Sequence, residues 1–523
     1  MNLWCKSASG LAAAALLLAS AHARTVSADW NDVTGPHSAV PLEVVGAGRA
    51  NEGLRADWQA QLGVVQREIG FKYIRMHGLL HDDMGVYFET KDGRPIYNFQ
   101  YVDTLYDALL AHHIRPFVEL SFMPAALASG PQTVFWWKGH VTPPKDEHKW
   151  VGLIHALLQH WKDRYGEEEI EKWYYEVWNE PDLKAFYTGT LQQYLQFYRD
   201  TAEAIKAVDP RCRVGGPASA IPYHYEQAFV AYCAATHAPV DFVSTHAYGV
   251  EKGFLDADGT AGTRLSANPD AVSDRMRHSR ELLDHSALPH LELHFTEWSS
   301  AYTPTDPIHD QYIQAPFMLE QIRRASSAVD SLSYWTFTDI FEENGPPRTP
   351  FHGGFGLINL QGIRKPAFYA YRFLSLLRGQ DLRTNDPQSW ITRSDDGRLT
   401  AVVWDYTPVV PPGHENDQTF FRRAQPPREL PPLTLQVQGI PAGNYYLQID
   451  RIGYGFHDPY DRYLAMGSPR DLSPDQVEEL DRRADAPAAS PARISLQAGD
   501  TFTRTFPMRT NDVYLIVLTP NQT

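Results

Sequence analysis

Hydrophobic and polar positions along residues 41–380 follow a pattern that switches repeatedly between two periods. Runs that are wholly apolar, or apolar at every second position, predict eight strands, at residues 42–48, 72–78, 115–122, 174–181, 211–218, 240–249, 291–298 and 331–339. Segments with a helical period follow them at some distance and predict helices near residues 52–68, 101–112, 149–165, 191–208, 224–236, 271–286, 309–328 and 366–378. Repeated strand–helix units call for a parallel sheet.

Two α/β folds are built from such units. Eight units over about 320 residues fit a (β/α)8 TIM barrel, which usually takes about 250 residues and grows by loop insertions. The alternative is an open, doubly wound sheet, which carries a glycine-rich phosphate-binding turn after its first strand. The stretch GAGRANEG at 46–53 has its glycines at a different spacing. The pattern therefore favours the barrel.

Beyond residue 380 the helical period disappears, and short β-rich runs are separated by turns. These runs predict strands at 399–406, 433–440, 444–450, 493–499 and 512–520. Residues 407–432 hold seven prolines and predict a loop. One amphipathic helix is expected at 472–484, capped by Ser473 with Pro474 at its first position. This alternation of short strands and turns is typical of a β-sandwich.

The first 23 residues have the pattern of an export signal. Lys6 provides positive charge, an Ala/Leu run follows at 11–18, and Ala21-His22-Ala23 offers small residues for cleavage. The apolar run is about half of the roughly 20 residues that cross a bilayer, so we expect an exported protein, periplasmic or secreted, without a membrane anchor. The expected organisation is a signal at 1–23, a segment at 24–40 that joins the β-sandwich, a catalytic barrel at 41–360 and a β-sandwich with short helical insertions at 361–523.

Composition narrows the kinds of partner. The chain has 47 basic and 63 acidic residues, a net charge of −16, and no basic run, which argues against nucleic-acid and membrane partners. Its 13 tryptophans suit a protein that stacks rings on the faces of sugars. The sequence leaves open whether Cys212 and Cys233 form a disulfide, and their spacing fits neither a metal site nor a redox motif.

Two glutamates stand at the carboxyl ends of predicted strands, where the side chains of a barrel converge on one face. Glu180 is the last residue but one of YYEVWNEP at 174–181, and Glu297 is the last but one of LELHFTEW at 291–298. Hydrolysis of a glycosidic bond uses one carboxylic acid to protonate the leaving oxygen and a second carboxylate to attack the sugar or activate water. This pair therefore indicates a glycoside hydrolase. The alternative is that both glutamates are structural.

The other strand ends supply hydrogen-bonding groups and aromatic rings without a metal-ligand pattern: Arg75, His77, Asn179, His246, Tyr248 and Trp335–Asp339. The acid needs a raised pKa, which burial or a nearby carboxylate provides, and we assign it to Glu180. Glu297 is the candidate nucleophile, with His246 and His294 as expected donors, and Asn179 is a candidate donor to a sugar hydroxyl. Arg75 has two interpretations, a contact in the site or a buried partner for a carboxylate.

The chain resembles glycoside hydrolase family 39, the β-xylosidase and α-L-iduronidase family. The motifs that carry the resemblance extend over almost the whole chain after the signal: GRANEGLRADW (48–58), YIRMHGLLHDDMGVY (73–87), PFVELSFMP (116–124), YEVWNEPDL (175–183), VGGPA (214–218), DFVSTHAYG (241–249), HFTEWSSAY (294–302) and YWTFTDIFEENGPP with PFHGGFGL (334–357). The resemblance implies a barrel with a β-sandwich, and hydrolysis with retention of anomeric configuration.

The resemblance also implies roles for individual residues. The acid/base of the Asn-Glu-Pro motif falls on Glu180, and the nucleophile of the Thr-Glu-Trp motif on Glu297. Its sugar-binding positions fall on His77, Asn179, His246, Tyr248, Trp335, Glu342 and Glu343. From the local pattern alone, the stretch 341–343 is a solvated loop.

We expect a retaining exo-β-xylosidase that releases xylose from the non-reducing end of β-1,4-linked xylo-oligosaccharides, with no cofactor or metal. An α-L-arabinosidase side activity is also expected. The alternatives are an endo- or exo-glycosidase of the same family on another polysaccharide, iduronidase-like or acting on an exopolysaccharide, and a non-catalytic sugar-binding protein. The sequence leaves the oligomeric state open.

Overall fold

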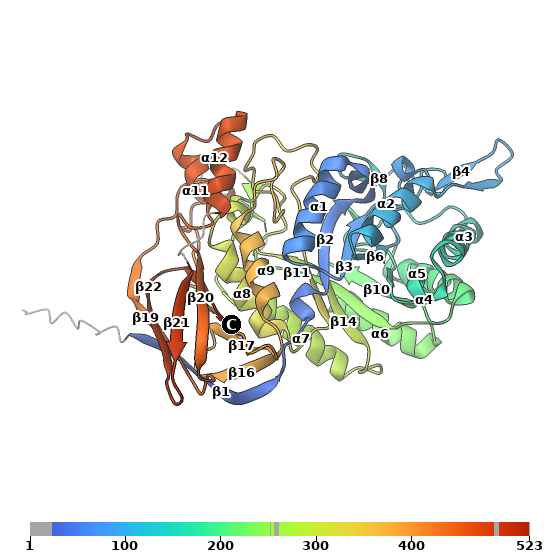
Figure 1. Cartoon of the computed structure of the whole chain (residues 1–523). Coiled ribbons are helices and arrows are strands. Elements are labelled where there is room, and N and C mark those ends of the chain that lie inside the picture. The colour runs from blue at the N-terminus through green and yellow to red at the C-terminus, as the bar shows by residue number, and fades with distance from the viewer. Residues whose placement is uncertain (1–22, 252, 256–260, 486–490, 522–523) are drawn as a thin grey trace, which may run out of the picture.

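The structure is a computed structural model that describes residues 23–251, 253–255, 261–485 and 491–521 (Figure 1). The export signal expected at 1–23 lies, except for its last residue, outside the described residues. Eight parallel strands close a barrel in the order β10-β11-β14-β15-β2-β3-β6-β9, which confirms the predicted fold. The strands are β2 (Val44–Arg49), β3 (Tyr73–His77), β6 (Arg115–Glu119), β9 (Tyr174–Glu176), β10 (Arg213–Ser219), β11 (Phe242–Tyr248), β14 (Glu292–Ser299) and β15 (Ser331–Tyr334).

Helices follow the barrel strands, as the periodicity predicted. They are α1 (Ala56–Glu68), α2 (Gln100–Ala111), α3 (Glu147–Tyr165), α4 (Glu167–Ile170), α5 (Leu191–Val208), α6 (His224–Thr236), α7 (Ala271–Asp284), α8 (Gln314–Ala325) and α9 (Pro366–Leu376). Helix α5 shows why they form here: the Thr190 hydroxyl accepts from the Gln193 amide, and the Gln193 side chain accepts from the Thr190 amide. Its apolar side packs on the barrel.

The loops contain short strands and 3-10 turns. They are the strands β4 (Tyr87–Glu89), β5 (Pro95–Tyr97), β7 (Thr133–Val134), β8 (Gly139–His140), β12 (Phe254–Leu255) and β13 (Ala261–Gly262), and the 3-10 turns η1 (Val40–Leu42), η2 (Ala50–Leu54), η3 (Asp82–Met84) and η4 (Pro307–Asp310). The helix expected from residue 309 begins at 314, because residues 307–310 form η4 instead.

The interior of the barrel is filled in layers. At the amino ends of the strands, five residues form an apolar plug: Val44, Tyr73, Phe117, Tyr174 and Phe242. Alternate side chains of a strand point to the same face. The positions two residues further on therefore also point inward, and they are charged on three strands: Arg75, Glu119 and Glu176. A buried charged layer thus lies directly above the plug.

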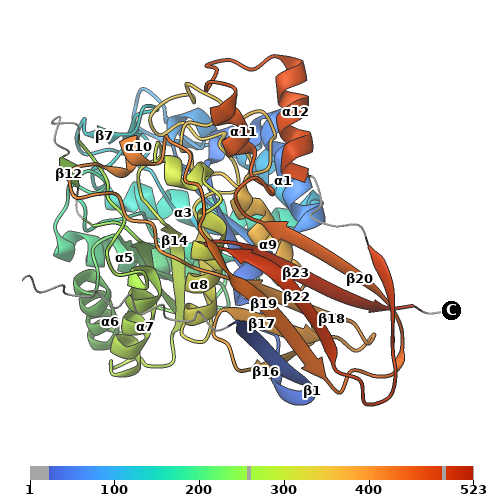
Figure 2. The ribbon, with the colours of Figure 1, turned by 90° about the vertical axis from the view of Figure 1, so that its left-hand side faces the viewer.

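A second sheet packs beside the barrel (Figure 2). Its nine strands run in the order β21-β20-β23-β18-β17-β16-β1-β19-β22. They are β1 (Arg24–Pro36), β16 (Gln380–Thr384), β17 (Ser389–Arg393), β18 (Leu399–Trp404), β19 (Glu429–Gln438), β20 (Gly443–Ile452), β21 (Ala492–Leu496), β22 (Phe502–Arg509) and β23 (Val513–Pro520). Residues from both ends of this sheet share one apolar cluster, including Leu435 of β19 and Leu447 of β20, so the sheet folds over into a sandwich.

The barrel and the sandwich are joined by packing and by polar contacts. Helix α9 contacts α8 on one side and strands β18 and β20 on the other. The Trp404 indole of β18 donates to the Glu320 carboxylate of α8 at 2.9 Å. The N-terminal strand β1 lies between β16 and β19, which are more than 340 residues away in sequence.

The remaining helices of the described residues are α10 (Asp417–Phe420), α11 (Pro459–Ala465) and α12 (Pro474–Asp485). Of these, α12 was predicted, whereas α10 lies in the predicted loop 407–432 and α11 was not predicted. Ser473 caps α12 by accepting from the Gln476 amide at 3.3 Å. Cys212 and Cys233 are buried free thiols. Among the helices of the described residues, none has the length and hydropathy of a membrane span.

Candidate active site

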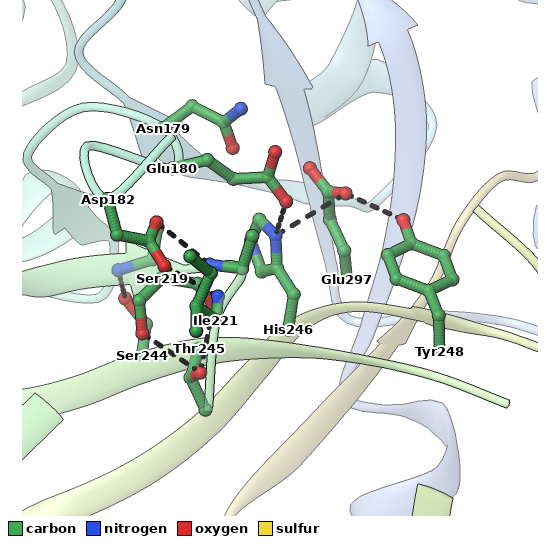
Figure 3. A network of polar contacts seen from close by, with 12 residues as sticks. Asn179, Glu180, Asp182, Ser219, Ile221, Ser244, Thr245, His246, Tyr248 and Glu297 are labelled. Carbon is green, nitrogen blue, oxygen red and sulfur yellow. Dashed lines mark hydrogen bonds and ion pairs between the residues drawn. The ribbon is translucent and has the colours of Figure 1, made fainter. Parts of the chain in front are cut away.

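A cavity of about 850 Å³ opens at the carboxyl ends of the barrel strands, a size typical of sites that enclose a small organic ligand. It is lined by seven residues that the sequence singled out: His77, Asn179, Glu180, Tyr248, Glu297, Trp335 and Glu343. His246 lies behind this wall, fully buried, against Glu180 (Figure 3). The fold thus brings residues from the ends of five strands, β3, β9, β11, β14 and β15, to one cavity.

Glu180 and Glu297 approach each other across His246 (Figure 3). The His246 Nδ1 atom lies 2.8 Å from Glu180 Oε1 and 3.5 Å from Glu297 Oε2. One oxygen of each carboxyl group and a ring nitrogen of His246 all lie within 4.8 Å of one another. Retaining glycosidases hold their carboxyl groups about 5–5.5 Å apart, whereas inverting ones leave about 6.5–9.5 Å for a water. This spacing therefore suits a pair in which one carboxylate attacks the sugar directly.

Two local departures from regular strand geometry place these glutamates. In β14 the register with β11 shifts between Phe295 and Glu297, so one extra residue lies in β14. Because of this bulge, His294 and Glu297 both point into the barrel although they are three positions apart. Glu180 follows β9 with φ +45°, and Trp178 has φ +77°, so the turn before Pro181 holds non-glycine residues in the left-handed region. Such local strain is common where a backbone must present a functional side chain.

Glu297 is held by two strong donors. Arg75 Nη1 donates to Oε1 at 2.8 Å, and the Tyr248 hydroxyl donates to Oε2 at 2.7 Å. Burial and the neighbouring carboxylates raise the pKa of Tyr248 well above 10, so the phenol keeps the proton that it donates. The prediction that His294 donates to Glu297 is wrong. Its ring contacts Ser331 and Glu292 near the apolar plug, away from Glu297.

Glu180 has the environment of an acid. It is 8% exposed, and burial together with the charge of Glu297 raises its pKa well above 4.5. Burial, with Arg75 nearby, lowers the pKa of His246 well below 6.5, so the ring is neutral. A neutral ring beside Glu180 adds no positive charge that would favour the ionised form. Glu180 therefore holds a proton at a pH where an exposed glutamate would lose it.

Arg75 is the buried partner of carboxylates, which decides between its two interpretations. Its side chain is fully buried and its donors reach four groups: Glu176 at 2.6 Å, Glu119 at 2.8 Å, Glu297 at 2.8 Å and the Asn179 side-chain oxygen at 2.9 Å. An arginine can only donate, so the Asn179 oxygen faces Arg75 and its amide nitrogen is directed away. Asn179 thus presents a donor to the cavity.

Replacing Arg75 with alanine is expected to destabilise the barrel strongly. The substitution leaves Glu119 and Glu176 buried without their cation, and removing one partner from a buried ion pair typically costs about 3–5 kcal/mol. Urea unfolding followed by tryptophan fluorescence measures the loss. The matched control is Arg383→Ala, because Arg383 pairs with Asp32 on the surface, and its midpoint should stay close to that of the wild type. Equal midpoints for both variants would contradict the role of Arg75.

His77 and Trp335 form one wall of the cavity. The Glu119 carboxylate contacts His77 Nδ1 at 2.7 Å and leaves Nε2, which lies 3.5 Å from Glu297 and 3.6 Å from Glu343. The ring packs against the Trp335 indole with centroids 4.7 Å apart. The carboxylate of Glu119 is thus held by His77, Arg75 and Ser121 inside the barrel.

The two neighbouring glutamates Glu342 and Glu343 point in different directions. Glu343 lines the cavity, and burial and the charge of Glu297 raise its pKa well above 4.5. The carboxylate of Glu342 pairs instead with Arg49 at 2.7 Å and Arg55 at 3.3 Å, and Glu342 is not among the described residues that line the cavity. The structure therefore brings Glu343 to the site but not Glu342.

Several lining residues were not predicted from the sequence: Phe135, Leu183, Phe186, Ile221, Tyr223, Arg275 and Tyr302. They belong to loops and to the first turns of α7, where no strand end marks them. In the loop between β6 and α3, Phe135 reaches the cavity, Trp137 packs inside the protein, and Trp136 is 55% exposed. A loop side chain reaches a site through the path of its loop, which periodicity does not describe.

Known proteins are similar to this chain in sequence and in fold. The family described as "Glycosyl hydrolases family 39" matches residues 27–501. The β-xylosidase of Geobacillus stearothermophilus is 44% identical over 366 residues, 69% of this chain and 72% of that protein. The β-xylosidase of Caldicellulosiruptor saccharolyticus is 37% identical over 444 residues, 83% of this chain and 86% of that protein. The crystal structure of the GH39 enzyme from Xanthomonas axonopodis pv. citri, 43% identical, superposes with a TM-score of 0.92 over 95% of this chain and 98% of that chain.

Proposed function

The chain belongs to glycosyl hydrolases family 39, as its motifs predicted, and is a glycoside hydrolase; from this premise we propose that it is a retaining exo-acting β-xylosidase. Its substrates would be β-1,4-linked xylo-oligosaccharides, from which it releases single xylose units at the non-reducing end. Support for the sugar comes from the two relatives named β-xylosidases, which are 44% and 37% identical. We include an α-L-arabinosidase side activity in the proposal, since the two sugars present similar hydroxyls.

In the first step, Glu297 attacks the anomeric carbon and forms a glycosyl ester as the bond to the leaving oxygen breaks. Glu180 transfers its proton to that oxygen, so the leaving sugar departs as a neutral alcohol. Arg75 and Tyr248 hold the attacking carboxylate in place, because each donates to a different one of its two oxygens. The raised pKa of Glu180 keeps its proton available at the pH of the reaction.

In the second step, the ionised Glu180 takes a proton from a water, and the water oxygen attacks the anomeric carbon. The ester bond to Glu297 breaks, xylose leaves with its original anomeric configuration, and Glu180 is again protonated. Two inversions at the same carbon give net retention. Asn179 donates to the 2-hydroxyl in both transition states, where such a contact is strongest.

The observation that carries the proposal is the approach of one Glu180 oxygen and one Glu297 oxygen to within 4.8 Å inside the cavity. A non-catalytic sugar-binding protein has no need to bury two acids side by side, because the arrangement costs stability through desolvation and repulsion. We also propose that the enzyme acts outside the cytoplasm, because β1 begins at Arg24, the residue after the expected cleavage position.

A panel of nitrophenyl glycosides tests the substrate. We expect kcat/KM on 4-nitrophenyl β-D-xyloside to exceed that on the α-L-iduronide by at least about 100-fold. Among the described residues, none with a free positive charge contacts Glu297, so the iduronate carboxylate would lose a contact of ~3 kcal/mol. Arg75, the cation nearest Glu297, is already engaged by three carboxylates. Chromatography of xylotetraose digests then separates exo from endo action. Preferred cleavage of the iduronide, or xylobiose as the first product, would contradict the proposal.

A further inference from the structure

The cavity continues past Glu180 toward the loop before α6 and the start of α7. This part is lined by Leu183, Phe186, Ile221, Tyr223 and Arg275. Glu180 protonates the oxygen of the leaving group under the proposed function, so the region beyond Glu180 is where the rest of the substrate, on its reducing side, would lie. Figure 3 shows Asp182 and Ile221 on this side of Glu180, opposite Tyr248.

Arg275 is unusual among the residues of this region. It is the one lysine or arginine among the described residues that line the cavity, whose acids include Glu180, Glu251, Glu297 and Glu343. Its Nη2 donates to the Thr245 hydroxyl at 3.2 Å, and in the part of the chain that the structure describes no carboxylate lies within 4.0 Å of it. Its Nε is buried and makes no hydrogen bond to the described residues. Arg75, by contrast, contacts three carboxylates.

The acids nearest to Arg275 are satisfied by other donors. Glu226 accepts from the Thr245 hydroxyl, from the Ser279 hydroxyl and from the Tyr223 amide. Asp182 accepts from the amides of Ala220 and Ile221 at 3.0 and 2.5 Å. Burial lowers the pKa of Arg275, which means that its surroundings compensate its charge only in part. Most of its five N–H groups thus remain available for a ligand in the cavity.

We propose that Arg275 forms an anion-binding subsite that takes the carboxylate of a uronic acid on the leaving-group side of the substrate. A guanidinium presents two parallel N–H groups that match a planar carboxylate, and such bidentate pairs are strong where water is excluded. A neutral sugar would leave the charge of Arg275 unpaired. The proposal rests on the proposed function for the identity of the leaving group, and it extends the substrate class to acidic, branched oligosaccharides.

The test compares two substrates that differ only in charge. One is xylobiose with an α-1,2-linked glucuronic acid on its reducing-end xylose, and the other is the methyl ester of the same compound. We expect the wild-type enzyme to cleave the acid with about 10-fold higher kcat/KM than the ester, and this preference should shrink as salt is raised. In Arg275→Gln the ratio should fall to about one. Arg275→Lys, which keeps the charge but not the fork, should give an intermediate ratio.

Arg277→Gln is the matched control. Arg277 lies on the same helix but is exposed and pairs with Asp274, so its substitution should leave the acid-to-ester ratio unchanged. A wild-type ratio of one, or a ratio that Arg275→Gln does not change, would overturn the subsite. If the enzyme cleaves no xyloside at all, the proposed function fails. Calorimetric binding of the acid and of the ester to wild type and to Arg275→Gln then still tests the subsite by itself.

Discussion

Replacing Glu297 with alanine is expected to lower kcat on 4-nitrophenyl β-D-xyloside by at least about 1,000-fold, a rise of ~4 kcal/mol in the activation barrier. The variant has no carboxylate at the end of β14 to attack the anomeric carbon. It keeps the other residues of the cavity, among them Asn179 and Trp335, so it should still bind xylobiose. Stopped assays measure turnover, and calorimetry measures binding.

A second experiment identifies the attacking residue directly. A 2-fluoro-β-xyloside with a good leaving group should trap the glycosyl ester in the wild type, because the fluorine slows the second step more than the first. Mass spectrometry of peptides should then place the label on Glu297. Glu292→Gln is the control on the same strand, since Glu292 contacts Tyr174 and His294 at the opposite end of the barrel. More than a few percent residual turnover in Glu297→Ala, or a label elsewhere, would refute this role.

Replacing Glu180 with alanine is expected to reduce kcat/KM on xylobiose by about 1,000-fold, within the range of general acid catalysis. The loss should be much smaller in the first step on a substrate with a good leaving group, which needs no proton. Added azide should then restore turnover and give β-xylosyl azide, because a small anion can enter the space of the missing carboxylate and attack the ester. Azide should not change the wild-type rate.

The dependence of kcat/KM on pH also tests the role of Glu180 as the acid, because the direction of its pKa shift is known. Burial and the charge of Glu297 raise the pKa of Glu180, and only its protonated form can serve the leaving oxygen. The wild-type kcat/KM on xylobiose should therefore persist above the usual range of a glutamate and fall as the pH rises through the raised value. In Glu180→Ala the alkaline fall should disappear for the activated substrate. An unchanged alkaline limb, or an inverted azide product, would reject Glu180 as the acid.

Periodicity alone located the eight barrel strands and their helices, because each element has a buried face that the apolar positions of its own sequence mark. The sandwich was harder. Strand β16 has a single buried apolar side chain, Leu382, and β22 contains Pro507, so neither has a clear strand pattern. Both strands owe their place to partners distant in the chain, since β16 pairs with β1 and β22 pairs with β19. Such pairings depend on tertiary context.

By itself, the sequence determined the barrel, the family motifs and the presence of Glu180 and Glu297 at strand ends that must converge. The groups that contact these two glutamates follow from the folded structure. An extra residue in β14 sets the direction of Glu297, so that Tyr248 and Arg75 hold it and His294 does not. The turn of a loop sends Glu343 into the cavity and Glu342 to Arg49. Periodicity encodes which face of an element is buried, whereas a contact between side chains depends on register, bulges and loop paths that arise when distant segments pack together.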